Sequence, residues 1–135
     1  MNFAYCIDDA FNTQCAVSIH SLLKNTDKNI SIHILHSDPE TFTKYIKIIE
    51  SKTDFRNINL YKVDTEDFIF PNLTNSHVSN ATYFRLYLEK YLKKKDVIVY
   101  LDADTIIMRN PLQLLEREIN TMRKNNFYLG ATKET

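Results

Sequence analysis

Glycine is nearly missing from this sequence, and its scarcity excludes the commonest loops that hold phosphate groups. Among 135 residues the only glycine is Gly130. A P-loop and a GxGxxG turn each need several glycines, because their backbone amides must approach the phosphates closely. If this chain binds a nucleotide, it does so without a glycine-rich loop.

Several other features are also missing. Seventeen basic residues balance 17 acidic ones, so no overall field attracts nucleic acid. No apolar run approaches the roughly 18 residues of a membrane span, and Asp8 and Asp9 interrupt the opening stretch before it could serve as a signal peptide. Cys6 and Cys15 lack CxxC spacing, which is typical of buried cysteines in a reducing compartment. We therefore expect a cytoplasmic protein, and the lysines at 93–95 leave peripheral attachment to the membrane open.

What the sequence does contain is a regular alternation of two patterns. Short apolar runs alternate with segments whose apolar residues keep helical spacing, and the length suits one domain over residues 1–135. Such an order predicts an α/β fold, a three-layer α/β/α sandwich with a mostly parallel central sheet. The expected strands are 2–7, 31–36, 58–63 and 96–101, and the expected helices cover 11–25, a segment opening at Pro39, and 81–92, the last preceded by a loop at 70–80.

Acidic residues follow the first and the last of these strands. Asp8 and Asp9 end the first, and Asp102 and Asp104 follow the fourth, which is apolar on both faces and reads as a central strand covered on both sides. Parallel α/β sheets bind ligands at the carboxyl ends of their strands, where the strand order reverses. We therefore expect the two acidic clusters to lie near each other.

The pair Asp102 and Asp104 indicates a metal-binding site. In an extended segment residues i and i+2 point the same way, and Mg²⁺ or Mn²⁺ prefers carboxylate oxygens completed by substrate phosphates. Two like charges beside an apolar strand are costly unless a positive group meets them. The simpler alternative is that such aspartates form turns or cap a helix.

Three stretches together resemble glycosyltransferase family 8, the retaining sugar-nucleotide transferases of the GT-A fold. "VIVYLDADTIIMRNPLQLL" is similar to the DxD region of that family, and "FAYCIDDAFNTQCAVSIHSLLKN" resembles its first strand and helix. "HVSNATYFRLYLEKYL" resembles its arginine-bearing helix. The three stand in family order across almost all of the chain. The resemblance implies a hexosyltransferase that moves glucose or galactose from a UDP-sugar donor to a saccharide or glycan acceptor.

The resemblance also implies roles for individual residues around the donor. Asp102, Ala103 and Asp104 match the DxD motif, whose aspartates bind Mn²⁺ or Mg²⁺ bridging the diphosphate, and Asp102 lies near the ribose or sugar. Arg85 matches the arginine beside the donor sugar and phosphates. Arg85 and Asp102 are thus the expected catalytic residues, although a surface pair between Arg85 and Glu89 would also explain the arginine.

The first strand is expected to bind the base. Asp8 matches the family's uracil-binding aspartate, and the backbone around Cys6 lines the same pocket. Ala10 and Phe11 stand where the family often has Asn-Tyr, so that Phe11 keeps the stacking ring and Ala10 loses the amide that reaches the ribose. Helix capping by Asp9 or a core position for Phe11 are the simpler alternatives.

The sequence departs from its family in one respect. The family continues with a second half that carries the acceptor site and a histidine serving as third protein ligand of the metal, whereas all four histidines here precede Asp102. We expect these residues to hold the donor-binding half only, truncated at the C-terminus. A sheet edge exposed in this way would favour self-association.

Three other functions compete with this interpretation. A response-regulator receiver would use "CIDDA" but needs a phosphoacceptor at the end of the third strand, which reads Val63-Asp64, and it leaves Asp102 and Asp104 without a role. A haloacid-dehalogenase-like phosphatase needs Thr or Val where Ile106 stands. A non-catalytic module that binds nucleotide sugars is the third alternative.

Overall fold

The computed structural model describes residues 1–26, 29–64 and 81–131. Its four strands are β1 (Asn2–Ile7), β2 (Ser31–His36), β3 (Ile58–Lys62) and β4 (Ile98–Tyr100). The longer helices are α1 (Asn12–Asn25), α2 (Thr43–Thr53) and α5 (Leu112–Lys124). Short turns of 3₁₀ helix, η1 (Asp9–Phe11) and η2 (Pro39–Phe42), precede α1 and α2. The strands expected from the apolar runs are therefore confirmed to within a few residues, although the predicted loop 70–80 lies outside the described residues.

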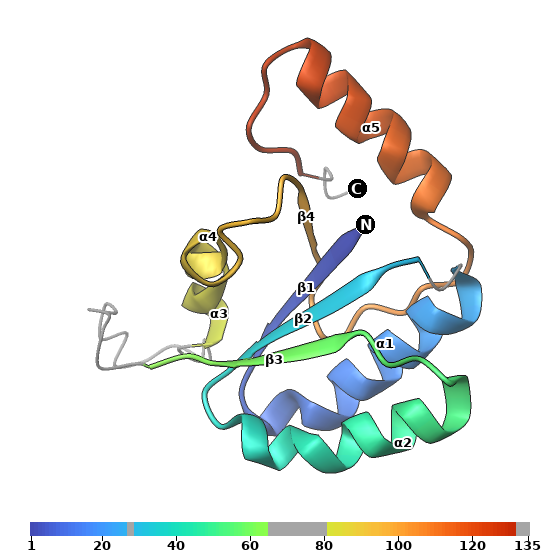
Figure 1. The fold of residues 1–135 in the computed structure, drawn as a ribbon, viewed down its shortest axis with the longest axis vertical. Helices are drawn as coiled ribbons and strands as arrows, with labels where there is room; N and C mark the ends of the chain where they lie inside the picture. The colour runs from blue at the N-terminus through green and yellow to red at the C-terminus, as the bar shows by residue number, and fades with distance from the viewer. Residues whose placement is uncertain (27–28, 65–80, 132–135) are drawn as a thin grey trace.

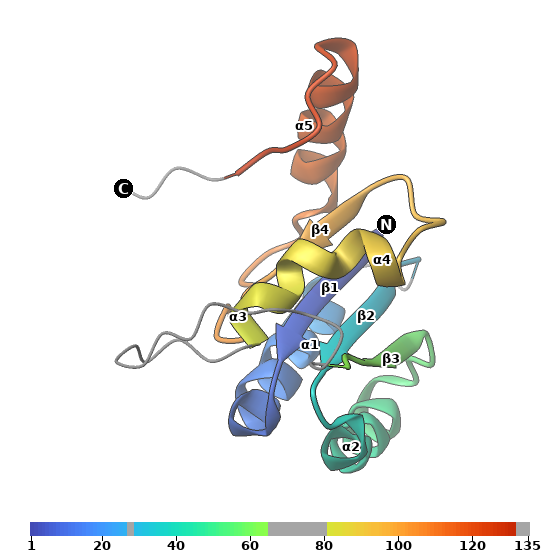
Figure 2. The same ribbon diagram turned by 90° about the vertical axis from the view of Figure 1, so that its left-hand side faces the viewer.

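All four strands are parallel, and they follow the order β3-β2-β1-β4. Helices α1 and α2 cover one face of this sheet, and the segment from α3 to α4 crosses the other (Figures 1 and 2). The chain thus moves outward from β1 to β2 and β3, then returns to place β4 on the other side of β1. This reversal produces the predicted three-layer α/β arrangement with a parallel central sheet.

Alternation along β1 and β2 divides the core into two clusters. Phe3 and Tyr5 of β1 point into the first, which is shared with the apolar faces of α1 and α2. Cys6 of β1 and Leu35 of β2 point into the second, where Phe84 covers them. Since successive strand residues face opposite sides, a parallel strand between two helical layers is apolar on both faces. Both β1 and β2 are buried at five of six positions.

Within the described residues β4 lies at an edge of the sheet and not at its centre. It was expected to be a central strand covered on both sides, but it pairs only with β1 among the described residues, and all three of its residues are half-buried. An apolar run cannot distinguish a central strand from an edge strand, because both faces of an edge strand also carry apolar residues when helices cover them. The buried centre of the sheet is formed by β1 and β2.

The helix predicted over 81–92 is present in three short pieces. These are α3 (Ala81–Phe84), a 3₁₀ turn η4 (Arg85–Tyr87) and α4 (Leu88–Tyr91). At the first junction the Arg85 Nε donates a hydrogen bond to the Thr82 carbonyl at 2.9 Å. The change in helical winding therefore coincides with the arginine that the sequence had singled out.

Helix α5 was not anticipated, although its sequence carried a signal for it. Pro111 stands at its N-cap, and Leu112, Leu115 and Ile119 follow at helical spacing. Leu112 and Leu115 pack against the first core cluster, and the rest of the helix projects beyond the sheet (Figures 1 and 2). Within the part of the chain that the structure describes, no helix combines the length and the apolar character that a membrane span requires.

Candidate functional site at the carboxyl ends of β1 and β4

The ends of β1 and β4 are neighbours in the sheet. Ala4 pairs with Tyr100, and the Leu101 amide donates a hydrogen bond to the Ala4 carbonyl at 3.0 Å. Two residues further on, this register sets Cys6 beside Asp102. Burial raises the pKa of the Cys6 thiol to about 12, and the charges of Arg85 and Asp102 also act on it. The topology therefore brings the residues after β1 and those after β4 to one edge, as predicted.

The backbone of the DxD segment differs from the extended strand that was expected. Strand β4 ends at Tyr100, and the Thr105 amide donates to the Asp102 carbonyl at 3.1 Å, which closes a turn. The argument that i and i+2 share a direction in a strand therefore does not apply here. Both Asp102 and Asp104 are nevertheless exposed, while Leu101 and Ala103 on either side of Asp102 are half-buried.

Hydrogen bonds from α1 fix the chain beyond this turn. The Ser21 hydroxyl accepts a hydrogen bond from the Ile107 amide at 2.9 Å, and the Asn25 side chain donates one to the Ile107 carbonyl at 2.9 Å. With Leu101 bonded to β1 on the other side, the acidic turn is anchored at both ends. Its carboxylates thus project from a fixed backbone.

Asp102 meets two side chains at the sheet edge. The Tyr100 hydroxyl donates a hydrogen bond to Asp102 Oδ1 at 2.6 Å, and Arg85 Nη2 lies 3.4 Å from the same oxygen. The guanidinium carbon of Arg85 also lies 4.6 Å from the centre of the Tyr100 ring, a cation–π arrangement. Burial raises the pKa of Tyr100, and the bond to Asp102 raises it further, so the phenol stays protonated as a donor.

This arrangement decides between two interpretations of Arg85. The ion pair that the described residues give it is with Asp102, 17 residues away, and not the surface pair with Glu89. A positive group is therefore present beside Asp102. Tyr100 was missed by the sequence reasoning, although its position two residues before Asp102 was a usable signal.

Asp8 closes the turn that follows β1. Its Oδ1 accepts a hydrogen bond from the Ala10 amide at 3.2 Å, and its carbonyl accepts one from the Phe11 amide at 3.2 Å. Asp8, and not Asp9, thus caps η1. Phe11 is 41% exposed, which removes the alternative that its ring belongs to the core, and Ala10 is exposed beside it.

A metal ion would find two protein carboxylates at this edge. No group of three His, Cys, Asp or Glu residues within 1–26, 29–64 and 81–131 is arranged to hold one. Asp102 and Asp104 still fit Mg²⁺ or Mn²⁺, because such ions commonly take one or two carboxylates and complete their shell with water and phosphate oxygens. The donor set is hard oxygen alone, which matches these ions and not a softer metal.

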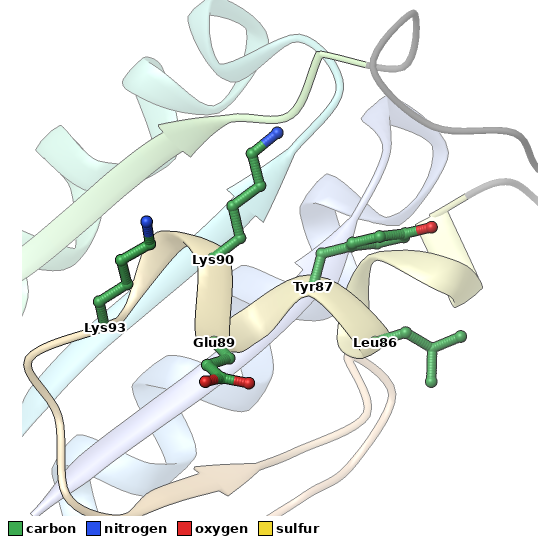
Figure 3. Close-up of a pocket in the computed structure, with 5 residues that line it drawn as sticks. All are labelled: Leu86, Tyr87, Glu89, Lys90 and Lys93. Carbon is green, nitrogen blue, oxygen red and sulfur yellow. The ribbon is translucent and has the colours of Figure 1, made fainter.

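A surface hollow of about 600 Å³ lies elsewhere, on η4 and α4, lined by Leu86, Tyr87, Glu89, Lys90 and Lys93. Figure 3 shows these side chains spread around the helical segment instead of converging on one point. None of the predicted site residues lines it. We therefore assign the hollow no ligand.

Comparisons with known proteins identify the family. Residues 2–134 match the model of "Glycosyl transferase family 8". The chain belongs to glycosyl transferase family 8. A putative glycosyltransferase of Haemophilus influenzae is 31% identical over 137 residues, and these cover 100% of this chain and 39% of that protein. A lipopolysaccharide 1,3-galactosyltransferase of Salmonella typhimurium is 35% identical over 108 residues, which cover 76% of this chain and 31% of the relative.

Solved structures share the fold. An active-site mutant of LgtC superposes with a TM-score of 0.71 at 26% identity, over 84% of this chain and 41% of LgtC. The galactosyltransferase LgtC in complex with donor and acceptor sugar analogs gives 0.66 at 25% identity, with the same coverage. The chain thus spans about two-fifths of the length of the Haemophilus influenzae relative and of LgtC, and less of the Salmonella typhimurium relative. The predicted family and fold are confirmed.

Two buried histidines lie within this family 8 fold. His33 and His36 are 2% and 0% exposed. Burial lowers the pKa of both; Lys95 lowers that of His33 further, whereas Asp38, Asp8 and Asp9 partly oppose the shift at His36. Both imidazoles are therefore neutral in the folded protein at neutral pH, and each is hydrogen-bonded on both nitrogens.

The lowered pKa values predict that acid destabilises the fold. Because the unfolded chain takes up these protons near pH 6.5 and the folded chain only at lower pH, the free energy of unfolding should fall as pH drops below about 6.5. Urea unfolding at about pH 7.5 and about pH 5.5 measures this. The double variant His33→Gln, His36→Gln should show a smaller difference between the two conditions. An equal difference would assign the acid sensitivity to other groups.

Proposed function

We propose that residues 1–135 form the donor-binding part of a metal-dependent, retaining glycosyltransferase that uses a UDP-sugar. The observation that carries this proposal is the Arg85–Asp102–Tyr100 group at the end of β4, beside the Asp8–Phe11 turn at the end of β1. Membership of family 8 supports it and removes the receiver and phosphatase alternatives. Relatives described as galactosyltransferases favour galactose, with glucose as the alternative, and a saccharide acceptor.

The diphosphate of the donor would lie against the acidic turn. Asp102 and Asp104 would hold Mn²⁺ or Mg²⁺, which would neutralise charge on the diphosphate as the bond to the sugar breaks. Arg85 brings a guanidinium to the same place, and its pair with Asp102 is exposed at both partners. A phosphate oxygen can therefore replace the carboxylate as its partner, and the arginine then stabilises the leaving group directly.

The base would lie against the turn after β1. Phe11 offers an exposed ring to the uracil, which suits stacking of a planar base. Asp8 uses Oδ1 to accept from Ala10, which leaves Oδ2 for the base. The backbone around Cys6 borders the same place, and Ala10 offers the ribose no side-chain amide.

One prediction of this proposal concerns the metal. UDP should bind more tightly with Mn²⁺ than without it, and Asp104→Asn should weaken the Mn²⁺-dependent part by about tenfold or more, since one carboxylate ligand is lost. Isothermal calorimetry of UDP with and without Mn²⁺ measures both effects. Asp54→Asn, at a positive-φ position between α2 and β3, is the matched control. Equal UDP affinity in the two conditions would exclude a metal bridge.

Phe11 provides a further prediction. Phe11→Ala should weaken UDP binding by about 5- to 100-fold, the range expected when one base loses an aromatic partner. The melting temperature should barely change, because the ring is largely outside the core. Phe127→Ala removes another exposed ring, 61% exposed, and should leave UDP affinity unchanged. A large loss of thermal stability with unaltered affinity would assign Phe11 to packing.

Sugar transfer requires more of a site than donor binding does. A donor and an acceptor must be held together in an oriented site, and such positioning can lower a barrier by several kcal/mol. Within the described residues no group of three His, Cys, Asp or Glu residues could hold a metal ion, so Asp102 and Asp104 are the protein ligands proposed here. A non-catalytic module that binds nucleotide sugars is therefore the second candidate function.

These residues alone should bind UDP-sugar weakly and release little UDP. The assay is UDP release from UDP-galactose and UDP-glucose in Mn²⁺, with Asp102→Asn as the blank. Sustained release well above that blank would demonstrate that residues 1–135 already hold the catalytic machinery, and would contradict the donor-binding assignment.

The outer edge of β4 supports a proposal about assembly. Among the described residues β4 has a strand on one side only, and unpaired edge groups tend to recruit another strand. We expect residues 1–135 to self-associate through this edge, as concentration-dependent sedimentation would reveal. A charge placed on it by Ile98→Lys should reduce the association. Monomeric behaviour at every concentration would contradict this expectation.

A further inference from the structure

One residue holds both ends of the turn that carries the proposed base pocket. In the sheet, His36 is the register partner of Ile7, the last residue of β1. Its Nε2 lies 2.8 Å from Asn12 Oδ1, at the first residue of α1. The four residues between Ile7 and Asn12 are Asp8, Asp9, Ala10 and Phe11.

The hydrogen bonds around His36 form a closed circuit. The Asp38 amide donates to His36 Nδ1 at 2.8 Å, so that Nε2 carries the proton and donates to Asn12 Oδ1. The Asn12 Nδ2 donates to the Thr41 hydroxyl at 3.0 Å. That hydroxyl in turn donates to the Asp38 carbonyl at 2.8 Å, and Asp38 completes the ring.

Because His36 and Asn12 are buried, each needs its hydrogen-bond partners in this circuit. His36 is fully buried and Asn12 is 5% exposed, and a buried polar group that loses its partner costs more than the bond itself contributes. Both the Oδ1 and the Nδ2 of Asn12 are engaged in this circuit, which fixes the orientation of its amide. The position of Asn12, and hence the backbone direction at Phe11, therefore depends on the imidazole of His36.

We propose that His36 is a positioning residue for the nucleotide: through Asn12 it sets the Asp8–Phe11 turn in the shape that receives the base. This inference rests on the function proposed above. His36 has no contact with the metal-binding aspartates or with Arg85 among its hydrogen bonds. Its effect should appear in the affinity for the uridine part of the ligand, and not in the dependence on Mn²⁺.

Two variants separate the two hydrogen bonds of the imidazole. The amide of His36→Gln reaches the position of Nε2 and keeps the donor to Asn12, but loses the acceptor for the Asp38 amide. The shorter amide of His36→Asn has its oxygen at the position of Nδ1 and keeps the bond from Asp38, but loses Asn12. Each variant gives up one buried hydrogen bond, so their losses of stability should be similar.

The experiment measures UDP affinity, the ratio of affinities with and without Mn²⁺, and amide exchange at Phe11 for the two variants. We expect His36→Asn to weaken UDP binding by about tenfold, the effect typical of losing an orienting contact behind a binding residue, and to speed exchange at Phe11. We expect His36→Gln to stay within about twofold of the unmodified chain, the size of effect left when the orienting bond is retained. The Mn²⁺ ratio should be the same in all three.

The outcomes are distinct. Equal weakening in both variants, or none in either, would make His36 a core residue only and overturn the inference. Failure of the unmodified chain to bind UDP would overturn the proposed function. In that case exchange at Phe11 still decides whether His36 sets the turn, and equal exchange rates in the two variants would overturn that as well.

Discussion

The parallel pairing of β4 with β1 is the contact on which the candidate site depends. It is short, since three residue pairs define its register, yet it places the chain after Tyr100 beside the chain after Ala4. The predicted site residues lie in or after one of these two strands or on the helical segment from α3 to η4. This pairing brings together Asp8 and Asp102, which are 94 residues apart in sequence.

Charge at this edge is arranged so that none of it is deeply buried. Asp102 keeps 59% of its side chain exposed and Arg85 keeps 39%, so neither carries the full penalty of leaving water. The aromatic ring of Tyr100 lies beneath the guanidinium, and its hydroxyl holds the carboxylate. The apolar residues of β4 thus support a charged group at their end without enclosing it.

Much of this fold could be predicted from the sequence because its signals are local. The alternation of apolar runs with helical spacing fixed the order of strands and helices, and the carboxyl-end rule placed Asp8 near Asp102. The predictions that were wrong depend on contacts made outside each segment. Whether β4 has one neighbour or two, and whether residues 102–105 are extended or turned, depends on pairing partners that an apolar pattern does not name. Tyr100 was missed because its apolar ring is typical of a strand residue, and the pattern gives no sign that its hydroxyl donates a hydrogen bond to Asp102.

The weakness of the Arg85–Asp102 pair suits the donor-binding role proposed for it. An ion pair exposed at both partners contributes at most about 1 kcal/mol, and the Arg85–Asp102 contact at 3.4 Å is long for a charged hydrogen bond. Such a pair orients the arginine but does not prevent it from binding a diphosphate. The several oxygens of a diphosphate offer bidentate contacts and more negative charge than one carboxylate. A buried pair of the same residues would resist that exchange, because each partner left behind would be an uncompensated charge in an apolar environment. Position at an open sheet edge therefore keeps both Arg85 and Asp102 available to a ligand.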